Sequence, residues 1–581
     1  MYPFTTGVSA VVLLFQVIQL TRSQQLYERP RPLQGAYNGP YEEICSSQIY
    51  CHGELLDDVQ SARLYPDSKT FVDMTMLRDE EDIVNDYKEL KKSYGGVPDN
   101  QTLLAFVNEN FKTEELQKWL PPDLVDYPAI VEYIRDPAYR QLAVDVNQIW
   151  KLLARKIPDD VRESPKRHSH IYVPNGFFVA GGRFSELYCW DTYWIIRGAL
   201  LCGMKDTVKG ILENMLHLVK TYGYMLNGNR VYYLKRSQPP LLIKMVYVYW
   251  VFSRDIKFIY DHIETLETEF NFWMSKRTII VEKAGKRYKM ARYNTATKGP
   301  RPESYYEDKA LAKSLPDADK DELYTRFKSA AESGWDFSSK HFNNYGQNTG
   351  TLMNTDPQNF IYVELNSILQ GNARILSELF LLTKNYAKAV KYAALAQRFQ
   401  IGIDALLWNE AAGIWMDYDI STQTHRNYFY PSNLTPLWTG SYNKRLTREY
   451  GELAVNYLLK NKIINENLEP NYLGVPTSLL DTHQQWDYPN CWPALEAIVI
   501  FGLDMTDSPR AKEVAYNLAS SWVYTNYVGF KKTGYMFEKY NAIYLGESGY
   551  GGEYVAQTGF GWTNGLLFEL LYKWGHKLKS E

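Results

Sequence analysis

Apolar residues recur along most of the chain at the three- and four-residue spacing of an amphipathic α-helix. A first set begins after Asp136, and a second set begins at Val208. The apolar positions are Leu142, Val146, Ile149, Trp150 and Leu153 in the first set, and Val208, Ile211, Leu212, Met215, Leu218 and Val219 in the second. Each set falls on one face, so each segment is predicted to be a helix with one buried side.

Two pairs of longer helices are predicted further along the chain. Residues 360–383 and 386–408 are both periodic and are separated by a short polar break, and residues 495–503 and 511–527 form a second such pair. Residues 79–95 are highly charged and are predicted to form a solvated helix. Strand signals are few and short, so the pattern predicts a mainly helical protein.

Long loops rich in glycine, proline and asparagine separate the predicted helices. They cover residues 222–241, 285–304, 331–358, 464–492 and 529–564. Loops of this length inside a compact domain are usually functional or disordered, and these hold most of the tryptophan, arginine and carboxylate clusters, so we interpret them as functional. The best strand signal, residues 230–234, lies in the first loop. Since no Pro/Ser-rich linker divides the chain, a single helical domain with its loops gathered into one site is predicted.

Composition narrows the classes of function. The chain has 581 residues, with 64 basic and 67 acidic side chains and a formal net charge of -3, so no basic excess indicates a nucleic-acid partner. Aromatic residues make up 15% of the chain and include 47 tyrosines, which fits a groove lined with rings and equally a large core. The cysteines and the 9 histidines show no zinc spacing, and we predict neither a metal nor another cofactor.

The N-terminal residues are predicted to be a targeting signal rather than part of the fold. Residues 8–20 form an apolar run of signal-peptide length, and residues 21–23 supply a cleavage site, which makes residues 1–23 a signal peptide. The absence of Lys and Arg before the apolar run leaves an uncleaved anchor as the alternative. No later run is long enough to span a bilayer, so we predict a secreted protein with no stable membrane span. Residues 24–44 are predicted to be a loose leader, and residues 576–581 a short tail.

Cysteine usage agrees with export. Cys45 and Cys51 are close enough for a small disulfide loop in an oxidising compartment, and the total of 5 cysteines leaves at least one thiol unpaired within the chain. Asn100 and Asn433 each begin an Asn-x-Thr sequence, so both are possible N-glycan acceptors if the chain is exported.

The stretch from Ala180 to Tyr193 carries the first candidate chemistry. It packs Arg183, Glu186 and Asp191 among aromatic residues, after two glycines that permit a tight turn. Trp190 beside a carboxylate suits a sugar ring, whose C–H face stacks on an aromatic ring while its hydroxyls bond to charged groups. Taken alone, the stretch fits equally well a buried helix start with a structural Arg–Glu pair.

Similar chemistry recurs in the later loops. These contain Asn227, Arg236 and Gln238, then Arg301 and Glu303, then Gly334 and Asp336, then residues 484–493 with a second Trp-Asp pair, and finally Glu538 and Glu553. Asp336 lies between two aromatic residues, which would raise its pKa by desolvation as a general acid requires. Five such clusters are hard to explain as packing, and a pair of carboxylates is the minimum machinery for glycoside hydrolysis. No GxSxG sequence indicates a serine nucleophile.

Together these motifs resemble the trehalases of glycoside hydrolase family 37, in particular the secreted animal enzymes. The signature PGGRFxExYxWDxY matches residues 181–193, with Ala180 in place of the proline, and a QWDxPNxWxP-like signature matches residues 485–493. The sequences NGNRxYYLxRSQPP, RPES, SGWDFSS, EKY and GGEYxxQxGFGWTNG also occur in the family's order. The resemblance extends over about residues 45–575, which would form a single catalytic domain.

The resemblance implies an all-α fold, an (α/α)6 toroidal barrel with long active-site loops. It also implies hydrolysis of α,α-trehalose to two glucose molecules with inversion and without a cofactor. By position it assigns the general acid to Asp336 and the general base to Glu538. The other positions that match the family's sugar pocket are Arg183, Phe184, Trp190, Asp191, Asn227, Arg236, Gln238, Arg301, Glu303, Gly334 and Glu553.

The chain departs from the family pattern at Ala180, at Asn541, where an Asp commonly follows EKY, and at residues 547–550, which interrupt a glycine run. Because no catalytic carboxylate or pocket arginine is lost, these changes bear on the motion of the glycine-rich flap and on affinity. Three alternatives remain: a catalytically weak paralogue that binds a disaccharide, an α/α-barrel glycosidase for another glucoside, and a non-enzymatic secreted scaffold.

Overall fold

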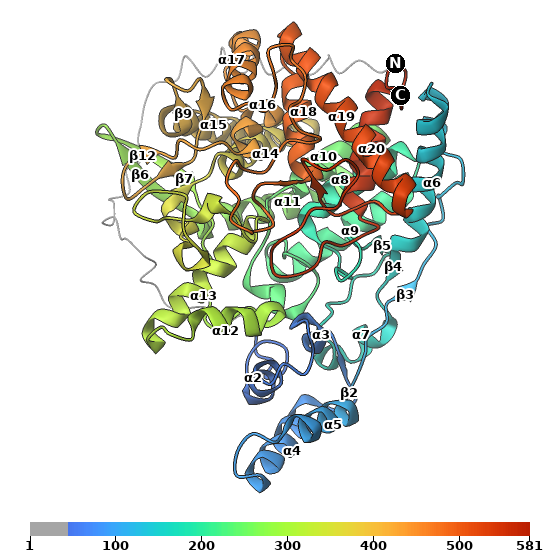
Figure 1. The fold of residues 1–581 in the computed structure, drawn as a ribbon, viewed down its shortest axis with the longest axis vertical. Helices are drawn as coiled ribbons and strands as arrows, with labels where there is room; N and C mark the ends of the chain where they lie inside the picture. Colours follow the sequence, from blue (N-terminus) through green and yellow to red (C-terminus); the bar gives the residue numbers. More distant parts are fainter. Residues whose placement is uncertain (1–44) are drawn as a thin grey trace. The chain divides into compact units, whose positions relative to one another are not determined.

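Helices buried on nearly every side alternate along the chain with helices buried on one face. In the computed structural model, which describes residues 45–581, the first group comprises α8 (Cys189–Leu201), α10 (Leu242–Ser253), α14 (Val363–Leu382), α16 (Thr435–Thr439), α18 (Pro493–Asp504) and α20 (Gly561–Trp574). Each of these contacts the next, and α20 contacts α8, so they close a ring (Figure 1). A helix that is apolar all round belongs in a core, which is where the ring places them.

The second group surrounds this ring. It comprises α6 (Pro137–Leu153), α9 (Lys205–Tyr222), α11 (Ile256–Lys276), α15 (Tyr386–Gly402), α17 (Thr447–Lys460) and α19 (Pro509–Thr533). For example, α9 packs on α8 and α10, α11 packs on α10 and α14, and α19 packs on α18 and α20. The result is an (α/α)6 toroidal barrel, which confirms the predicted fold class.

The alternation also positions the functional loops. Successive inner and outer helices form antiparallel hairpins, so the inner helices run in the same direction and begin at one end of the ring. The loops that carry the candidate residues lead into inner helices α8, α10, α14, α18 and α20. Those residues are therefore delivered to a common mouth of the barrel.

The long periodic segments of the sequence are helices in the structure. The predicted pairs correspond to α14 with α15 and α18 with α19, and the charged segment is α4 (Glu80–Ser93). Helix α6 begins with Pro137 after Asp136, whose carboxylate accepts hydrogen bonds from the N–H groups of Ala138 and Tyr139. This cap satisfies donors that the first turn leaves open.

The strand predicted at residues 230–234 is wrong. Val231–Lys235 form a 3-10 turn in which Tyr232 and Tyr233 are both buried. The two hydroxyls have different hydrogen-bond partners. The Tyr232 hydroxyl donates to Asp73, and that of Tyr233 pairs with the Tyr188 hydroxyl at 2.8 Å. Both rings are thus held by side-chain contacts rather than by a neighbouring strand. A hairpin of β6 (Thr278–Lys283) and β7 (Lys286–Ala291), partly within a predicted loop, was not foreseen.

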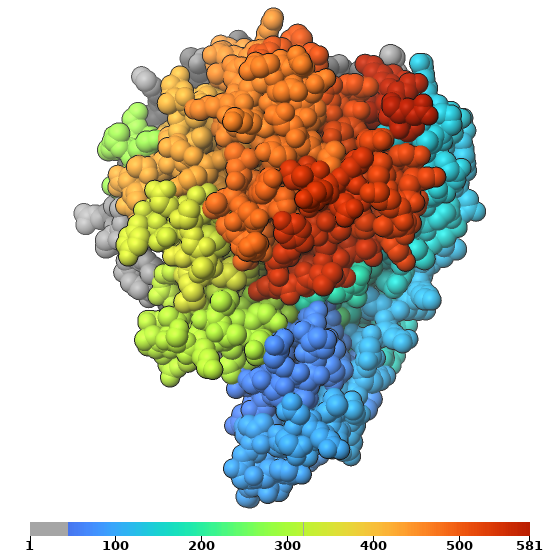
Figure 2. All heavy atoms as spheres, viewed as in Figure 1, coloured from blue at the N-terminus to red at the C-terminus, as the bar shows by residue number. Residues whose placement is uncertain are grey.

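Short elements fill the connections. The other helices are α2 (Glu54–Ser61), α3 (Lys69–Val72), α5 (Asn100–Asn110), α7 (Asp159–Glu163), α12 (Tyr305–Ala312) and α13 (Asp317–Glu332). The paired strands are β1 (Thr75–Met76) with β2 (Phe111–Lys112), β3 (Gln117–Lys118) with β4 (Ala154–Lys156) and β5 (Phe177–Phe178), β9 (Trp408–Asn409) with β10 (Ile414–Trp415), β8 (Phe360–Ile361) with β11 (Tyr418–Asp419) and β12 (Thr424–His425), and β13 (Asn490–Cys491) with β14 (Tyr540–Asn541). In Figure 2 the blue residues of α2 lie against the yellow-green α12, with which α2 is in contact.

The disulfide between Cys45 and Cys51 is confirmed, with an S–S distance of 1.98 Å. The predicted signal peptide and leader lie outside the described residues. Within residues 45–581 no helix combines the length and apolar character needed to cross a bilayer.

Asn433 is buried, and its amide nitrogen donates to the Tyr428 carbonyl at 3.0 Å and to the Tyr457 hydroxyl at 2.9 Å. A glycan on Asn433 would have to replace these two hydrogen bonds, whereas the side chain of Asn100 is exposed.

Candidate active site

The turn that carries Arg183 is built around two glycines. Gly182 has a φ of 57°, and a Cβ there would lie 2.0 Å from the side-chain oxygen of Gln557. That oxygen accepts the Arg183 backbone N–H at 2.9 Å, so the close approach requires glycine. The Arg183 guanidinium donates through Nε and Nη2 to the two carboxylate oxygens of Asp67, each at 2.7 Å. It also lies over the ring of Tyr554, with 4.9 Å between Cζ and the ring centroid.

The second arginine loop joins several predicted pocket residues. Arg236 donates to Asn227 through Nε and to Glu303 through Nη2, each at 2.7 Å. The side-chain oxygen of Gln238 accepts the Trp190 backbone N–H at 3.0 Å, which ties this loop to the start of α8. Although burial alone would raise the pKa of Glu303, the nearby guanidiniums hold it below its usual value.

Arg301 is gripped by two carboxylates. Its Nη2 donates to Asp308 and to Glu553, each at 2.6 Å, and the Ser304 hydroxyl also donates to Glu553 at 3.2 Å. Arg301 is 1% exposed, so these bonds form away from bulk water. Glu553 thereby anchors the glycine-rich segment before α20 to the loop before α12.

The backbone at Asp336 is fixed by the tight turn at Gly334 and by a hydrogen bond to the Asp336 carbonyl. Gly334 has a φ of 80°, and a Cβ there would lie 3.1 Å from the indole of Trp190. The Asp336 carbonyl accepts a hydrogen bond of 2.6 Å from the side-chain amide of Gln485. Burial raises the pKa of the Asp336 carboxyl to about 7, with Glu553 adding to the shift while Arg301 opposes it. A carboxyl with this pKa remains largely protonated in mildly acidic solution, as a proton donor must.

Glu538 is 2% exposed and keeps several partners that favour its charge. The Tyr554 hydroxyl donates to Oε1 at 2.8 Å, and the Gln557 backbone N–H donates to Oε2 at 3.1 Å. The Lys539 ammonium lies 3.9 Å from Oε2 and donates to the Gln485 side-chain oxygen at 2.7 Å. Burial raises the pKa of Glu538, while Lys539 and these hydrogen bonds oppose the rise. Gln485 thus bridges the backbone of Asp336 to the neighbour of Glu538.

Asp191 is a third buried carboxyl in this region, and the charges of Asp336 and Glu538 both affect its pKa. It is 6% exposed, and burial together with the charges of Glu538 and Asp336 raises its pKa to about 8. Its protonation state therefore depends on the charges of two other loops, those that carry Glu538 and Asp336. A neutral Asp191 can donate a hydrogen bond to a ligand, whereas an ionised one only accepts.

Tryptophans form one wall of this region. Trp486 stacks on Trp335 with 5.4 Å between ring centroids and on Trp492 with 3.8 Å, and Trp190 lies 5.9 Å from Trp486. The second Trp-Asp pair thus contributes Trp486 to the wall, while Asp487 accepts hydrogen bonds from Ser339. The other predicted ring, Phe184, packs edge-on against Tyr554 at 5.1 Å.

All the predicted pocket residues belong to this connected region, and it also contains residues that sequence reasoning missed. Tyr554 and Gln557 lie in the matched glycine-rich tail, so that motif could have identified them. Lys539 lies inside the EKY sequence, and Asp308 lies seven residues after Arg301. Asp67 carried no local signal, because its partner Arg183 is 116 residues away in sequence.

The departures from the family pattern leave the surrounding backbone well bonded. The Ala180 carbonyl accepts the Gly561 N–H at 2.8 Å, and the Asn541 side-chain oxygen accepts the N–H groups of Ile543 at 2.8 Å and Tyr544 at 3.2 Å. The Tyr550 N–H donates to Asn490 at 2.9 Å. Residues 547–550 are therefore attached to the loop before α18 at one end of the glycine-rich segment.

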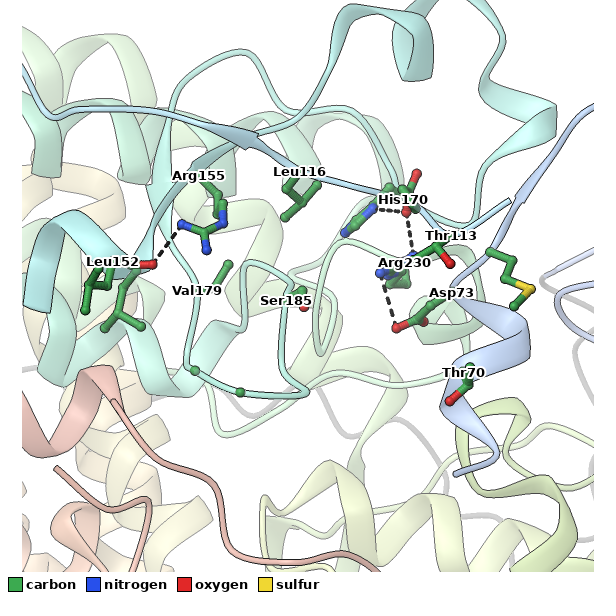
Figure 3. Close-up of a pocket in the computed structure, with 15 residues that line it drawn as sticks. Thr70, Asp73, Thr113, Leu116, Leu152, Arg155, His170, Val179, Ser185 and Arg230 are labelled. Carbon is green, nitrogen blue, oxygen red and sulfur yellow. Dashed lines mark hydrogen bonds and ion pairs between the residues drawn. The ribbon is translucent and has the colours of Figure 1, made fainter. Parts of the chain in front are cut away.

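A cavity of about 330 Å³ lies behind the Arg183 turn, on the side of α3 (Figure 3). Its lining includes Gly181, Gly182, Arg230 and Asp73, but neither Asp336 nor Glu538. Arg230 pairs with Asp73 at 3.4 Å and with Glu114 at 2.8 Å across this cavity. Among the described residues no group of three or more His, Cys, Asp or Glu side chains is arranged to hold a metal ion.

Comparisons with known proteins agree with this geometry. A family model described as Trehalase matches residues 63–575. The chain is 45% identical to a trehalase from Pimpla hypochondriaca over 535 residues, which cover 92% of this chain and 90% of that protein. It is 42% identical to a trehalase from Homo sapiens over 538 residues, covering 92% of this chain and 91% of that protein. A solved structure of neutral trehalase from Saccharomyces cerevisiae superposes with a TM-score of 0.54 at 20% identity, covering 68% of this chain and 73% of that one, and so shares the fold.

Proposed function

Since the chain belongs to the trehalase family, we propose that Asp336 and Glu538 are the acid and the base with which it hydrolyses α,α-trehalose to two glucose molecules. The observation that carries this proposal is their shared environment. Gln485 joins their two loops, because its amide nitrogen donates to the Asp336 carbonyl at 2.6 Å and its oxygen accepts from Lys539, the neighbour of Glu538, at 2.7 Å. Both are held by backbone or side-chain bonds from other loops.

The different environments of the two carboxyls suit different roles. Burial raises the pKa of Asp336 to about 7, which keeps a proton on the carboxyl in mildly acidic solution. It protonates the glycosidic oxygen as the C–O bond breaks. Glu538 accepts two hydrogen bonds and lies beside Lys539, which favours the carboxylate that a general base needs. It takes a proton from the water that attacks the anomeric carbon on the opposite face, so the configuration inverts.

The three arginines of the pocket orient the sugar. Each guanidinium is fixed by at least one carboxylate, so its remaining N–H groups point in set directions toward ligand hydroxyls. Trp190 supplies a flat apolar face for the C–H face of a sugar ring, and the stacked Trp486 supports the wall behind it. The positions of Arg183, Arg236 and Arg301 thus support recognition of a neutral polyhydroxylated substrate.

Incubation of the purified protein with trehalose, maltose and sucrose, with released glucose as the readout, tests this function. We expect glucose from trehalose and little from the other two. Rapid hydrolysis of maltose would favour the alternative of a glycosidase for another glucoside. Binding of trehalose without glucose release would favour a catalytically weak paralogue.

The remaining parts of the proposal concern the whole chain. Residues 45–575 form one catalytic domain, and the chain is secreted after removal of residues 1–23. The Cys45–Cys51 disulfide supports an oxidising compartment. The exposed side chain of Asn100 is the site for a glycan.

A further inference from the structure

The carboxylate partner of Arg183 comes from a different part of the chain than the partners of the other two arginines. Arg301 pairs with Asp308 and with Glu553 of the glycine-rich segment, and Arg236 pairs with Glu303 of the adjacent arginine loop. Asp67 lies instead in the N-terminal segment, between α2 and α3. Its two oxygens receive Nε and Nη2 of Arg183, each at 2.7 Å, in a bidentate pair. No hydrogen bond within residues 45–581 uses Nη1 of this guanidinium.

Helix α3 holds Asp67 in position. The Lys69 backbone N–H donates to Asp67 at 2.9 Å, and the buried Lys69 ammonium pairs with Glu186 at 2.6 Å. Glu186 also accepts from Arg230 at 2.8 Å, and Arg230 pairs with Asp73 at the end of α3, as Figure 3 shows. Lys69, Glu186 and Arg230 are almost fully buried, whereas Asp67 and Asp73 are partly exposed. The segment around α3 is therefore bonded to the stretch that contains Arg183 at two points, through Asp67 and through Lys69.

The same segment is bonded to the Arg301 loop. The Ser68 hydroxyl donates to Glu307 at 2.8 Å, and the Gln60 amide donates to the Ser68 carbonyl at 2.8 Å and to the Pro302 carbonyl at 3.4 Å. Residues 60–73 therefore fasten two of the three arginine loops together. Burial would raise the pKa of Asp67, but the Arg183 guanidinium holds it below its usual value.

We propose that Asp67 is a positioning residue for substrate recognition. It orients the Arg183 guanidinium through Nε and Nη2 and so presents Nη1 to a sugar hydroxyl. A bidentate carboxylate fixes the plane of a guanidinium, which a single hydrogen bond does not. The inference rests on the proposed role of Arg183 in the pocket. It assigns to the N-terminal segment a part in substrate affinity that acts through Arg183.

A double-mutant cycle on kcat/KM tests the proposal, using Asp67→Asn, Arg183→Lys and the double variant. We expect Asp67→Asn to lower kcat/KM by about tenfold to a hundredfold, the loss of one charge-assisted hydrogen bond. In the Arg183→Lys background the same change should have an effect of less than about threefold, because the fork that Asp67 orients is gone. The matched control is Asp57→Asn in the preceding helix α2, which removes a pairing with Lys309 but touches no pocket arginine. Its kcat/KM should equal that of the wild type.

Two results would overturn the proposal: additive losses in the cycle, or full activity of Asp67→Asn. If Asp67→Asn does not fold, Asp67→Glu replaces it, since it keeps the charge but displaces the carboxylate by one methylene. Its loss should be smaller and should likewise vanish in the Arg183→Lys background. A loss shared equally by Asp57→Asn would mean that the segment acts only through stability, which also overturns the proposal. Retained activity of Asp336→Asn would overturn the catalytic assignment while leaving this cycle unaffected.

Discussion

Replacing Asp336 with asparagine makes it possible to measure the effect of this carboxyl on the free energy of unfolding separately from its effect on catalysis. Burial raises its pKa from 3.8 to about 7, a difference of about three pH units. Each unit corresponds to about 1.4 kcal/mol, so the ionised carboxyl disfavours the folded state by at most about 4 kcal/mol. The amide that Asp336→Asn introduces would be neutral at every pH and would carry no such penalty.

The sign of the effect follows from proton linkage. Below about pH 4 the carboxyl is protonated in both folded and unfolded states, and its ionisation costs nothing. As the pH rises toward 7 the unfolded state releases the proton while the folded state keeps it, so the wild-type free energy of unfolding falls by about 1.4 kcal/mol per unit. The advantage of Asp336→Asn should therefore grow between pH 4 and pH 7 and then level off at about 4 kcal/mol.

Chemical denaturation at several pH values measures this difference, and glucose release measures the catalytic effect. We expect kcat of the variant to fall by about 10²–10⁴, the usual contribution of a general acid. The matched control, Asp319→Asn on the exposed side of α13, should change neither quantity. A stability difference that does not vary with pH would refute the raised pKa, and with it the physical basis for assigning the acid to Asp336.

Three further outcomes are expected. Glu538→Gln should lower kcat by about 10²–10⁴ as the base is lost, and near-normal turnover in folded protein would contradict its role. Proton NMR of early turnover should show equal amounts of α- and β-glucose, because inversion changes one anomeric centre while the leaving glucose keeps its configuration; an initial product that is all α would indicate retention. Glycopeptide mass spectrometry of secreted protein should find a glycan on exposed Asn100 and none on buried Asn433; an occupied Asn433 would mean that glycosylation precedes folding of this region.

The helices that could be predicted best are those with one buried face. Helices α6 and α9 retain a clear apolar period because their other faces meet water. The inner helices α8 and α20 are buried on nearly every side, so their apolar residues show little helical period. The wrong strand at residues 230–234 has a related cause, since tyrosines favour strands in general but here are buried by contacts with distant side chains.

The site was predictable where its chemistry lies within short motifs. Asp336 lies between two aromatic residues, and Glu538 is the first residue of the EKY sequence. The family resemblance gave each of them a proposed role. The partners that tune them could not be read in the same way. Asp67 and Gln485 act across 116 and 149 residues of sequence, respectively, and only the folded chain brings them to Arg183 and Asp336. The spacing of residues in a sequence indicates which side chains share one face of a helix, but it does not indicate contacts between segments that are far apart in the sequence.

The pairing of every pocket arginine with a carboxylate has a consequence for how substrate arrives. Each cation in the mouth is compensated within a few ångströms, and Lys539 stands beside Glu538 in the same way. The opening therefore projects little field into solvent and gathers few counterions. A neutral disaccharide would gain nothing from such a field and displaces no salt as it enters. We therefore expect the rate of substrate binding to vary little with salt concentration.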